Sequence, residues 1–200
     1  MDKKLIMISL SVVIITKNEA HNIVRCLEAV RTIADEIVIV DSGSTDETAA
    51  LCQLYQARFI SHPFQDYMQQ KNYATQQASS PYILSLDADE VVSTALLNAI
   101  QAAKQNWQYD VYVLQRLNNY CGQWIRHGGW YPDRKIRLFD RRKAAWGAGA
   151  VHERLLPQPD ATIGTLTGDL LHYSYSSIAE HVARNNRYTT QIATFAFQQG

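Results

Sequence analysis

The chain has 200 residues, enough for one large domain or for one domain with a small appendage. Its 19 basic and 19 acidic residues balance, so no overall positive charge favours nucleic acid, and we expect no nucleic-acid partner. The three cysteines are odd in number and far apart, which argues against a disulfide framework or a zinc ribbon and fits a reducing cytosol.

The first residues form an apolar stretch that resembles a signal peptide only superficially. It runs from Leu5 through residues 11–15 and then meets Lys17, without the small-residue pattern of a cleavage site. A stretch of about ten apolar residues is too short to span a bilayer. We therefore interpret it as the first core strand, and no transmembrane helix is predicted elsewhere.

Strand and helix patterns alternate along the first half of the chain. Short apolar, β-branched runs predict strands, and apolar residues at helical spacing predict helices. The predicted strands are 11–16, 36–40, 58–60, 82–86 and 109–117, and the predicted helices are 20–31, 45–56, 67–77 and 96–105. Apolar strands separated by helices imply an α/β fold with a mostly parallel central sheet and helices on both faces.

The alternation ends after residue 117. Residues 118–159 are rich in aromatic residues, glycine and arginine, and we expect loops that lie over the open end of the sheet. Residues 178–197 predict a helix that stops near Gly200 without a convincing cap.

Polar residues follow three of the predicted strands, at 16–19, 41–46 and 87–90. Ligands bind beyond the carboxyl ends of strands in open α/β sheets, so these ends indicate one binding site. Asp87 and Asp89 stand two positions apart and can project to the same side, where a divalent cation would relieve their repulsion. The alternative is a solvated strand-to-helix turn, because Asp-x-Asp is a common pattern.

Asp41 directly follows a buried strand, where an acid can accept a hydrogen bond from a base N–H or a sugar hydroxyl. Residues 42–46 then predict a tight turn, which Gly43 permits. We favour ligand contact for Asp41 and helix capping for Ser44 and Asp46. The segment lacks the Gly-x-Gly-x-x-Gly and Gly-Lys-Ser/Thr patterns, so it predicts neither a dinucleotide site nor a P-loop.

Three motifs occur in the order that one enzyme family shows. They are Ser-Val-Val-Ile-Ile-Thr-Lys-Asn-Glu at 11–19, Val-Asp-Ser-Gly-Ser-Thr-Asp-Glu-Thr at 40–48 and Asp-Ala-Asp-Glu at 87–90. Residues from about Ser9 to Glu90 thereby resemble the family 2 glycosyltransferases with a GT-A fold. Three later segments look like one branch of that family, the lipopolysaccharide-core glucosyltransferases that add β-linked glucose to an inner-core heptose. They are 137–141, 151–153 and 171–175.

The resemblance implies inverting transfer of a hexose from a UDP-hexose, with UDP-glucose expected, and a divalent cation, Mn²⁺ or Mg²⁺. The residues that it assigns to the nucleotide sugar are Thr16, Asn18, Glu19, Asp41 at the uracil, Lys71, Asp87 and Ala88. Asp89 is the expected metal ligand. Two assignments have alternatives: Lys71 could be a solvated lysine on a polar helix, and His172 could be a buried, hydrogen-bonded histidine instead of a metal ligand.

Inverting transfer needs one carboxylate that accepts the proton of the acceptor hydroxyl. Glu153 is the predicted base, because it follows the small-residue segment 147–150, which allows close approach of substrate. The alternative for Glu153 is a surface ion pair with a neighbouring arginine. Asp133 is the competing candidate for the base.

Aromatic and basic residues in the second half predict an acceptor site. The aromatic ones are Trp124, Trp130, Tyr131 and Trp146. Flat rings suit stacking on sugar faces, although core packing is the alternative for about half of them. The basic run 134–143 includes Arg134 and Arg137 and is predicted to contact acceptor phosphates and the anionic membrane surface, with one or two residues left for the donor diphosphate.

We therefore expect a single GT-A domain over residues 1–200. Its nucleotide-sugar half covers about 1–110, its acceptor-binding and catalytic half about 111–176, and its C-terminal helix 177–200, which we expect to be truncated. The glycolipid acceptor of the resembled branch predicts a cytoplasmic enzyme attached peripherally to the inner face of the cytoplasmic membrane.

Three alternatives remain at this point. One is a family 2 transferase with another donor or acceptor, such as another surface polysaccharide or a lipid phosphate. A nucleotidyltransferase is disfavoured because no glycine-rich phosphate loop follows the first strand. A non-catalytic nucleotide-sugar-binding module is disfavoured by the presence of both Asp89 and Glu153.

Overall fold

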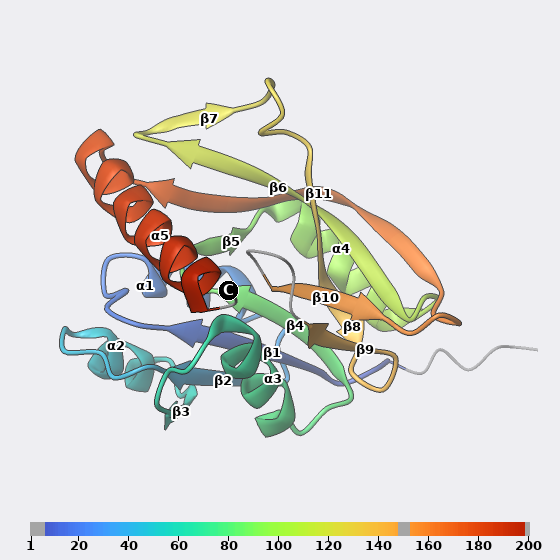
Figure 1. Cartoon of the computed structure of the whole chain (residues 1–200). Helices are drawn as coiled ribbons and strands as arrows, with labels where there is room; N and C mark the ends of the chain where they lie inside the picture. Colours follow the sequence, from blue (N-terminus) through green and yellow to red (C-terminus); the bar gives the residue numbers. More distant parts are fainter. Residues whose placement is uncertain (1–6, 148–152, 199–200) are drawn as a thin grey trace, which may run out of the picture.

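The computed structural model of the chain describes residues 7–147 and 153–198. Its first half alternates strands and helices as the sequence predicts (Figure 1). In order, these are β1 (Leu10–Thr16), α1 (Ile23–Val30), β2 (Glu36–Asp41), α2 (Thr48–Leu54), β3 (Arg58–Ser61), α3 (Tyr67–Gln77) and β4 (Tyr82–Asp87). The predicted elements are confirmed, although α1 and α2 are shorter than expected.

The second half contains more strands than the sequence predicts. Its elements are β5 (Glu90–Val92), α4 (Thr94–Gln105), β6 (Val111–Tyr120), β7 (Gln123–Ile125), β8 (Asp133–Asp140), β9 (Ala144–Gly147), β10 (Arg154–Pro157), β11 (Ile163–Tyr175) and α5 (Ile178–Gln198). The expectation of loops over 118–159 was wrong. β8 carries several charged residues, some of them buried in ion pairs, so it lacks apolar alternation, and β7, β9 and β10 are too short to show a period.

One nine-stranded sheet forms the centre of the molecule, in the order β3-β2-β1-β4-β8-β6-β11-β5, and β7 pairs with β6. The first four strands of that order are parallel, as are β6 and β11, whereas β8 is antiparallel to both β4 and β6. Thr16 pairs in register with Asp41, and Ile15 with Asp87, so β1, β2 and β4 end at the same edge. The predicted α/β class with a mostly parallel sheet is confirmed.

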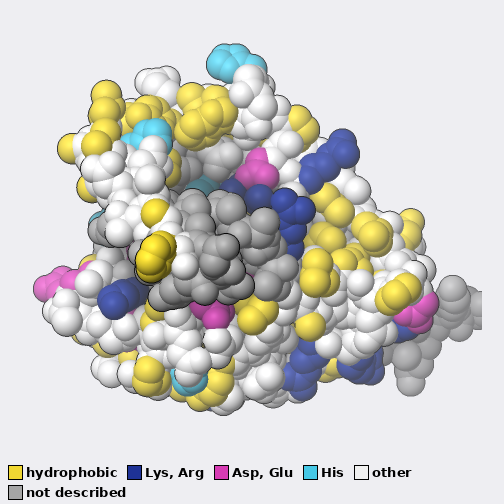
Figure 2. Space-filling view, viewed as in Figure 1, with side chains coloured by type: hydrophobic (Ala, Val, Ile, Leu, Met, Phe, Trp, Pro, Cys, Tyr) yellow, Lys and Arg dark blue, Asp and Glu magenta, His cyan; other side chains and the backbone are white. Residues whose placement is uncertain are grey.

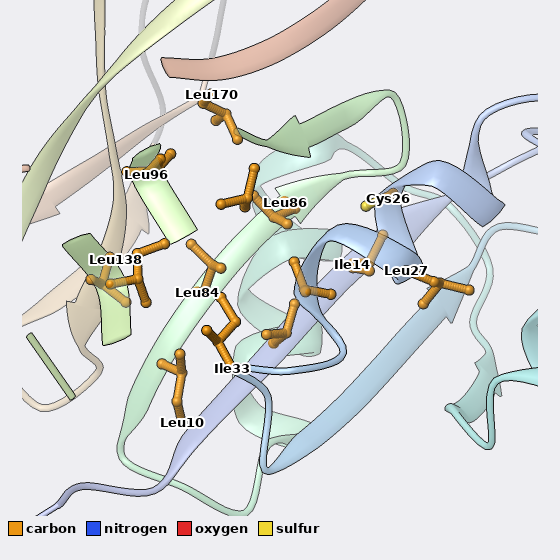
Figure 3. Packing of buried hydrophobic residues seen from close by; sticks show 14 of the residues in the cluster. Leu10, Ile14, Cys26, Leu27, Ile33, Leu84, Leu86, Leu96, Leu138 and Leu170 are labelled. Atoms are coloured by element: carbon orange, nitrogen blue, oxygen red, sulfur yellow. The ribbon is translucent and has the colours of Figure 1, made fainter. Parts of the chain in front are cut away.

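Alternate residues of the central strands supply two apolar layers. Leu10 and Ile14 of β1 face one side, where they pack with Leu27 of α1 and Leu96 of α4 (Figure 3). Val13 faces the other side, which α3 and the β9–β10 strands cover. Full burial of such a side chain stabilises the fold by about 1.5–3 kcal/mol relative to exposure, an upper estimate. Helices therefore cover both faces, as predicted.

The β9–β10 hairpin is a two-stranded sheet of its own, outside the nine-stranded sheet. Trp146 of β9 pairs with Leu155 of β10, and both side chains are buried in the layer that includes Ala74 of α3. Glu153 immediately precedes β10, so the position of the hairpin determines where this carboxylate lies.

Helix α5 follows the long strand β11 and contacts it through an aromatic cluster. The ring of His181 lies 4.3 Å from that of Tyr175, and its Nδ1 is 3.1 Å from the hydroxyl of Tyr120. Within residues 7–147 and 153–198, no helix combines the length and apolar character needed to cross a bilayer.

Candidate active site

The turn after β2 is built around the buried carboxylate of Asp41. This carboxylate accepts hydrogen bonds from the backbone N–H groups of Gly43 (2.9 Å) and Ser44 (2.8 Å) and from the hydroxyl of Ser44. Gly43 has φ +82°, a conformation that a side chain would strain. Asp46 accepts the N–H of Thr48 (3.0 Å), the first residue of α2, but the N-cap position is Glu47, so Asp46, predicted as the cap, lies one residue before it.

The loop after β1 is joined to that turn. The N–H of Asn18 donates to the hydroxyl of Ser44 (2.8 Å), and the side-chain oxygen of Asn18 accepts the N–H of Thr45 (2.8 Å). The prediction that Ser44 caps the helix was therefore wrong, because its hydroxyl links the two loops. Thr16, at the end of β1, has a buried hydroxyl that makes no hydrogen bond to the part of the chain that the structure describes.

Glu19 completes this edge. Its backbone N–H donates to the hydroxyl of Thr48 (2.9 Å), and its carboxylate accepts the amide N–H of Asn22 (2.6 Å). Burial, together with the nearby charge of Asp89, raises the pKa of Glu19 above its ordinary value. The four predicted nucleotide contacts thus lie at the ends of β1 and β2 and in the loop that follows β1.

Asp87 at the end of β4 is ion-paired on two sides. The ammonium of Lys71 lies 2.9 Å from Oδ1 of Asp87, and the guanidinium of Arg137 lies 2.8 Å from Oδ2. Burial opposes the charge on Asp87, but Lys71 and Arg137 outweigh it and hold the pKa of Asp87 well below its usual range. The alternative of a solvated Lys71 was wrong, because only 1% of its side chain is exposed.

Glu90 and Arg116, which were not predicted as site residues, form ion pairs at this end of the sheet. The carboxylate of Glu90 is fully buried and accepts from the guanidinium groups of Arg137 (2.8 Å) and Arg116 (3.3 Å). The third acid of the 87–90 motif was the available signal for Glu90, whereas nothing in the sequence distinguished Arg116. Arg137 lies here, 4% exposed, and not beside the exposed Arg134 with which it was grouped.

Asp89 faces His172, because the pairing of β5 with β11 sets Glu90 opposite His172. Nε2 of His172 is 3.3 Å from Oδ2 of Asp89, and its Nδ1 is 2.6 Å from the side-chain oxygen of Asn118. The amide N–H of Asn118 donates to the backbone oxygen of Trp130 (3.2 Å), which assigns that oxygen to the His172 side.

The hydroxyl of Ser174 also lies 2.9 Å from Nδ1, so the tautomer of His172 depends on which group donates at Nδ1, and Nε2 faces the Asp89 carboxylate. With the proton on Nδ1, Nε2 and Asp89 are two facing acceptors that a cation between them would satisfy. An imidazole and a carboxylate held in this way fit a divalent metal such as Mn²⁺. In residues 7–147 and 153–198, no group of three or more His, Cys, Asp or Glu side chains is gathered for a metal. Ala88 is buried in the turn beside this pair.

Glu153 also contacts Lys71, whose ammonium lies 2.7 Å from Oε1. The Glu153 side chain is 17% exposed. One buried ammonium thus joins the end of β4 to the predicted base, and the alternative of a surface pair between Glu153 and an arginine is not observed in the described residues. Residues 148–150 of the predicted small-residue segment lie outside the described residues.

Asp133, the competing candidate, is held by cations. Arg116 contacts its Oδ2 through Nε (2.9 Å) and Nη2 (2.7 Å), and Lys135 lies 3.0 Å from Oδ1. Burial opposes the charge, but these ion pairs dominate and lower the pKa of Asp133. A carboxylate with a lowered pKa is a weaker proton acceptor.

The predicted acceptor residues separate into two groups. Trp130 and Arg134 are exposed, and the hydroxyl of Tyr131 lies 2.9 Å from Asp169, a hydrogen bond that raises the pKa of Tyr131. Trp146 instead lies in the core, 5% exposed. The backbone oxygen of Trp130 accepts a hydrogen bond from Asn118, whose side-chain oxygen contacts His172.

The later part of the basic run supports the fold. Arg141 donates to backbone oxygens at the end of α3, Arg142 pairs with Asp140, and Lys143 pairs with Asp160. Figure 2 shows several Lys and Arg side chains beside an acidic side chain near the middle of the face in view. The prediction of a continuous phosphate-binding run was therefore too broad, and Arg134 and Lys135 are the members left near the site.

A sequence profile described as glycosyl transferase family 2 matches residues 11–155. The chain belongs to this family. Lipopolysaccharide core biosynthesis glycosyltransferase LpsC of Rhizobium meliloti (strain 1021) is 34% identical over 209 residues, which cover 96% of this chain and 73% of LpsC. An uncharacterised glycosyltransferase of Rickettsia bellii (strain RML369-C) is 32% identical over 202 residues, 96% of this chain and 68% of that protein.

The crystal structure of S. aureus TarS 1-349 in complex with UDP-GlcNAc shares the fold, with a TM-score of 0.60 and 16% sequence identity. The match covers 84% of this chain and 59% of the TarS chain, so the chain spans less than two thirds of that structure. The family 2 glycosyltransferase therefore has the expected GT-A fold, and it is an enzyme of the glycosyltransferase class.

Proposed function

We propose that this glycosyltransferase moves glucose from UDP-glucose, with inversion, onto an inner-core heptose of lipopolysaccharide. The observation that carries the proposal is the buried ammonium of Lys71, which lies within 2.9 Å of Asp87 at the end of β4 and within 2.7 Å of Glu153. Lys71 therefore contacts both the donor end of the sheet and a carboxylate suited to act as base. The similarity to LpsC supports a role in lipopolysaccharide core synthesis.

The loops after β1 and β2 form the nucleotide site in this proposal. The Oδ1 atom of Asp41 accepts only the hydroxyl of Ser44 among the described residues, so it has lone-pair capacity for the uracil N–H. Thr16 offers a buried hydroxyl without a partner in the described chain, and Asn18 and Glu19 line the same edge. A ligand that supplied a hydrogen bond to Thr16 would remove the cost of that unpaired group.

Asp89 and His172 would hold a divalent cation, because Nε2 of His172 and the Asp89 carboxylate face each other at 3.3 Å. Such a cation, when bound, neutralises charge on the departing diphosphate. Lys71 and Arg137 already balance the charge of Asp87, so Asp87 serves the donor site by holding these two cations there. The small side chain of Ala88 allows close approach of the donor.

Glu153 acts as the general base. The acceptor hydroxyl oxygen bonds to the anomeric carbon opposite UDP, the bond from that carbon to the diphosphate oxygen breaks with its electron pair leaving on UDP, and the hydroxyl proton passes to Glu153. Lys71 holds Oε1, so Oε2 is the oxygen that receives the proton. Asp133 is less suited to this role because Arg116 and Lys135 engage both of its oxygens and lower its pKa, whereas Lys71 engages one oxygen of Glu153.

Trp130, Tyr131 and Arg134 form the acceptor side in this proposal, and the partly exposed Trp130 offers aromatic surface for a sugar. Arg137 braces Asp87 and Glu90 instead of meeting the acceptor. An anionic, membrane-borne acceptor suits the exposed Arg134, and we propose peripheral attachment to the inner face of the cytoplasmic membrane. Residues 1–110 then serve the donor, and residues 111–176 serve the acceptor and the chemistry.

The test is transfer from labelled UDP-glucose to purified inner-core glycolipid, with Glu153→Gln as the central variant. Turnover should fall by about 10² to 10⁴, whereas UDP affinity in calorimetry should change by less than about twofold. Asp133→Asn is the comparison variant, and its loss of turnover should be much smaller. Near wild-type turnover for Glu153→Gln, with loss for Asp133→Asn, would move the base to Asp133.

The same assay tests donor and acceptor. UDP-glucose should exceed UDP-galactose and UDP-GlcNAc, and glycolipid that lacks heptose should accept no label. Label transferred equally well to the heptose-free glycolipid would reject the acceptor. Binding of UDP-glucose with neither transfer nor donor hydrolysis would indicate a non-catalytic binding module.

A further inference from the structure

Two adjacent residues of α3 contact the part of the chain that carries Glu153. Lys71 binds the Glu153 carboxylate directly. The amide of Asn72, the next residue, makes two hydrogen bonds to the backbone of Trp146, because its Nδ2 donates to the Trp146 oxygen (2.8 Å) and its Oδ1 accepts the Trp146 N–H (3.1 Å). Asn72 thus pairs with β9 in the way that a neighbouring strand would.

The β9–β10 hairpin needs such an attachment because it shares no ladder with the nine-stranded sheet. Its apolar contacts, which include the buried Trp146 and Leu155, are non-directional, and Arg141 in the turn before β9 ties only that end of the hairpin to the C-terminal end of α3. The paired hydrogen bonds from Asn72 are directional and fix both the height and the rotation of β9 relative to α3.

This fixation reaches Glu153 through the hairpin ladder. Trp146 stands opposite Leu155, and Gly147 opposite Arg154, the residue that follows Glu153. A shift of Trp146 would therefore move the backbone of Glu153, while the ammonium of Lys71 stays with α3. The ring of Trp146 also lies 4.6 Å from the Lys71 ammonium, so the same shift would alter that contact.

We infer that Asn72 is a positioning residue for the catalytic carboxylate. It acts on Glu153 through the backbone of Trp146, without touching either substrate. The inference rests on the proposed role of Glu153 as base, and it adds a residue of the donor-side helix to the machinery of proton transfer. A displacement of about 1 Å in a reacting group can cost about 10²-fold in rate.

The experiment is a double-mutant cycle of Asn72→Ala and Glu153→Gln, with transfer turnover and UDP affinity as readouts. Asn72→Ala alone should lower turnover by about 10-fold to 100-fold, with little change in UDP affinity. In the Glu153→Gln background it should change turnover by less than about twofold, because the group that it positions is already disabled. Hydrogen exchange should rise at residues 144–147 and 154–157 and stay unchanged in the body of α3.

Gln76→Ala is the matched control. Gln76 lies one turn further along α3 and, with Asn72, Ala144 and Ala145, lines a groove between α3 and β9. It makes no hydrogen bond to the described hairpin residues, so turnover of the variant should match wild type. Asn72→Asp is a second variant that keeps the side-chain shape and the acceptor for the Trp146 N–H. Because its carboxylate repels the Trp146 oxygen, Asn72→Asp should lower turnover in the wild-type background but not in the Glu153→Gln background, as Asn72→Ala does.

Equal losses of turnover from Asn72→Ala in both backgrounds would overturn the inference, because a general structural effect is additive. Unchanged turnover in both Asn72 variants would also overturn it. If Glu153→Gln alone retained wild-type turnover, the proposed base would fail, and that result is distinct from failure of the Asn72 coupling.

Discussion

Replacement of Lys71 by methionine removes one buried charge and keeps most of the apolar side chain. Wild-type Lys71 is 1% exposed and pairs with Asp87 and Glu153, whose side chains are 27% and 17% exposed. Removing one partner of a buried ion pair costs about 3–5 kcal/mol. We expect the lower limit, about 3 kcal/mol, because Asp87 keeps Arg137 and both acids retain some contact with water.

Urea denaturation measures this loss as a lower midpoint at unchanged slope. In thermal unfolding, a loss of about 3 kcal/mol lowers Tm by roughly 6–12 °C for a chain of this length. Lys104→Met is the control, because Lys104 is also mostly buried but pairs with one half-exposed carboxylate, Asp35. Its loss should be about 1 kcal/mol.

The pH dependence identifies charge as the cause. The pKa of folded Asp87 lies below its ordinary value, so the stability it contributes is complete above the ordinary value and is lost as pH falls through the folded pKa. In Lys71→Met, Asp87 loses a cation that lowers its pKa and takes up a proton more readily. The difference in unfolding free energy between wild type and variant should therefore shrink as pH falls from about 5 to about 2. A difference that is equal at both pH values, and equal to that of Lys104→Met, would refute ion pairing as its source.

Two further predictions concern the donor site. Asp89→Asn should weaken UDP binding in the presence of Mn²⁺ by at least about 10-fold, because one of the two facing ligands is lost. Metal-free UDP binding should stay unchanged. Calorimetry that shows the same UDP affinity with Mn²⁺ for variant and wild type would remove Asp89 from the metal site. UDP should bind more tightly than CDP, because Asp41 accepts the uracil N–H, and competition of each nucleotide with labelled UDP-glucose measures the order; tighter binding of CDP would reject uridine as the preferred base.

The fold of the first half could be predicted because each element is a local pattern. The apolar runs of β1, β2 and β4 and the helical spacing between them specify strands and helices directly. The polar residues at the strand ends then had to meet, since parallel strands end at one edge. Thr16, Asn18, Glu19 and Asp41 were placed together for that reason.

The second half could not be predicted in the same way because its strands depend on distant partners. Charged residues occur along β8. The strand is accommodated in the centre of the sheet because Arg137 forms ion pairs with Asp87 and Glu90 there. A strand that contains buried charges shows no apolar alternation, so the sequence does not reveal it until the partners of those charges are known.

The sequence by itself determined the family, the α/β class and the edge of the sheet at which the donor residues gather, because motifs and periodicity are local properties of the chain. Only the tertiary structure decided which charges meet. Lys71 and Glu153 are 82 positions apart, and their contact follows from the packing of the β9–β10 hairpin on α3. His172 faces Asp89 because β11 pairs with β5. Such contacts are set by register and packing between distant segments, which no local pattern encodes.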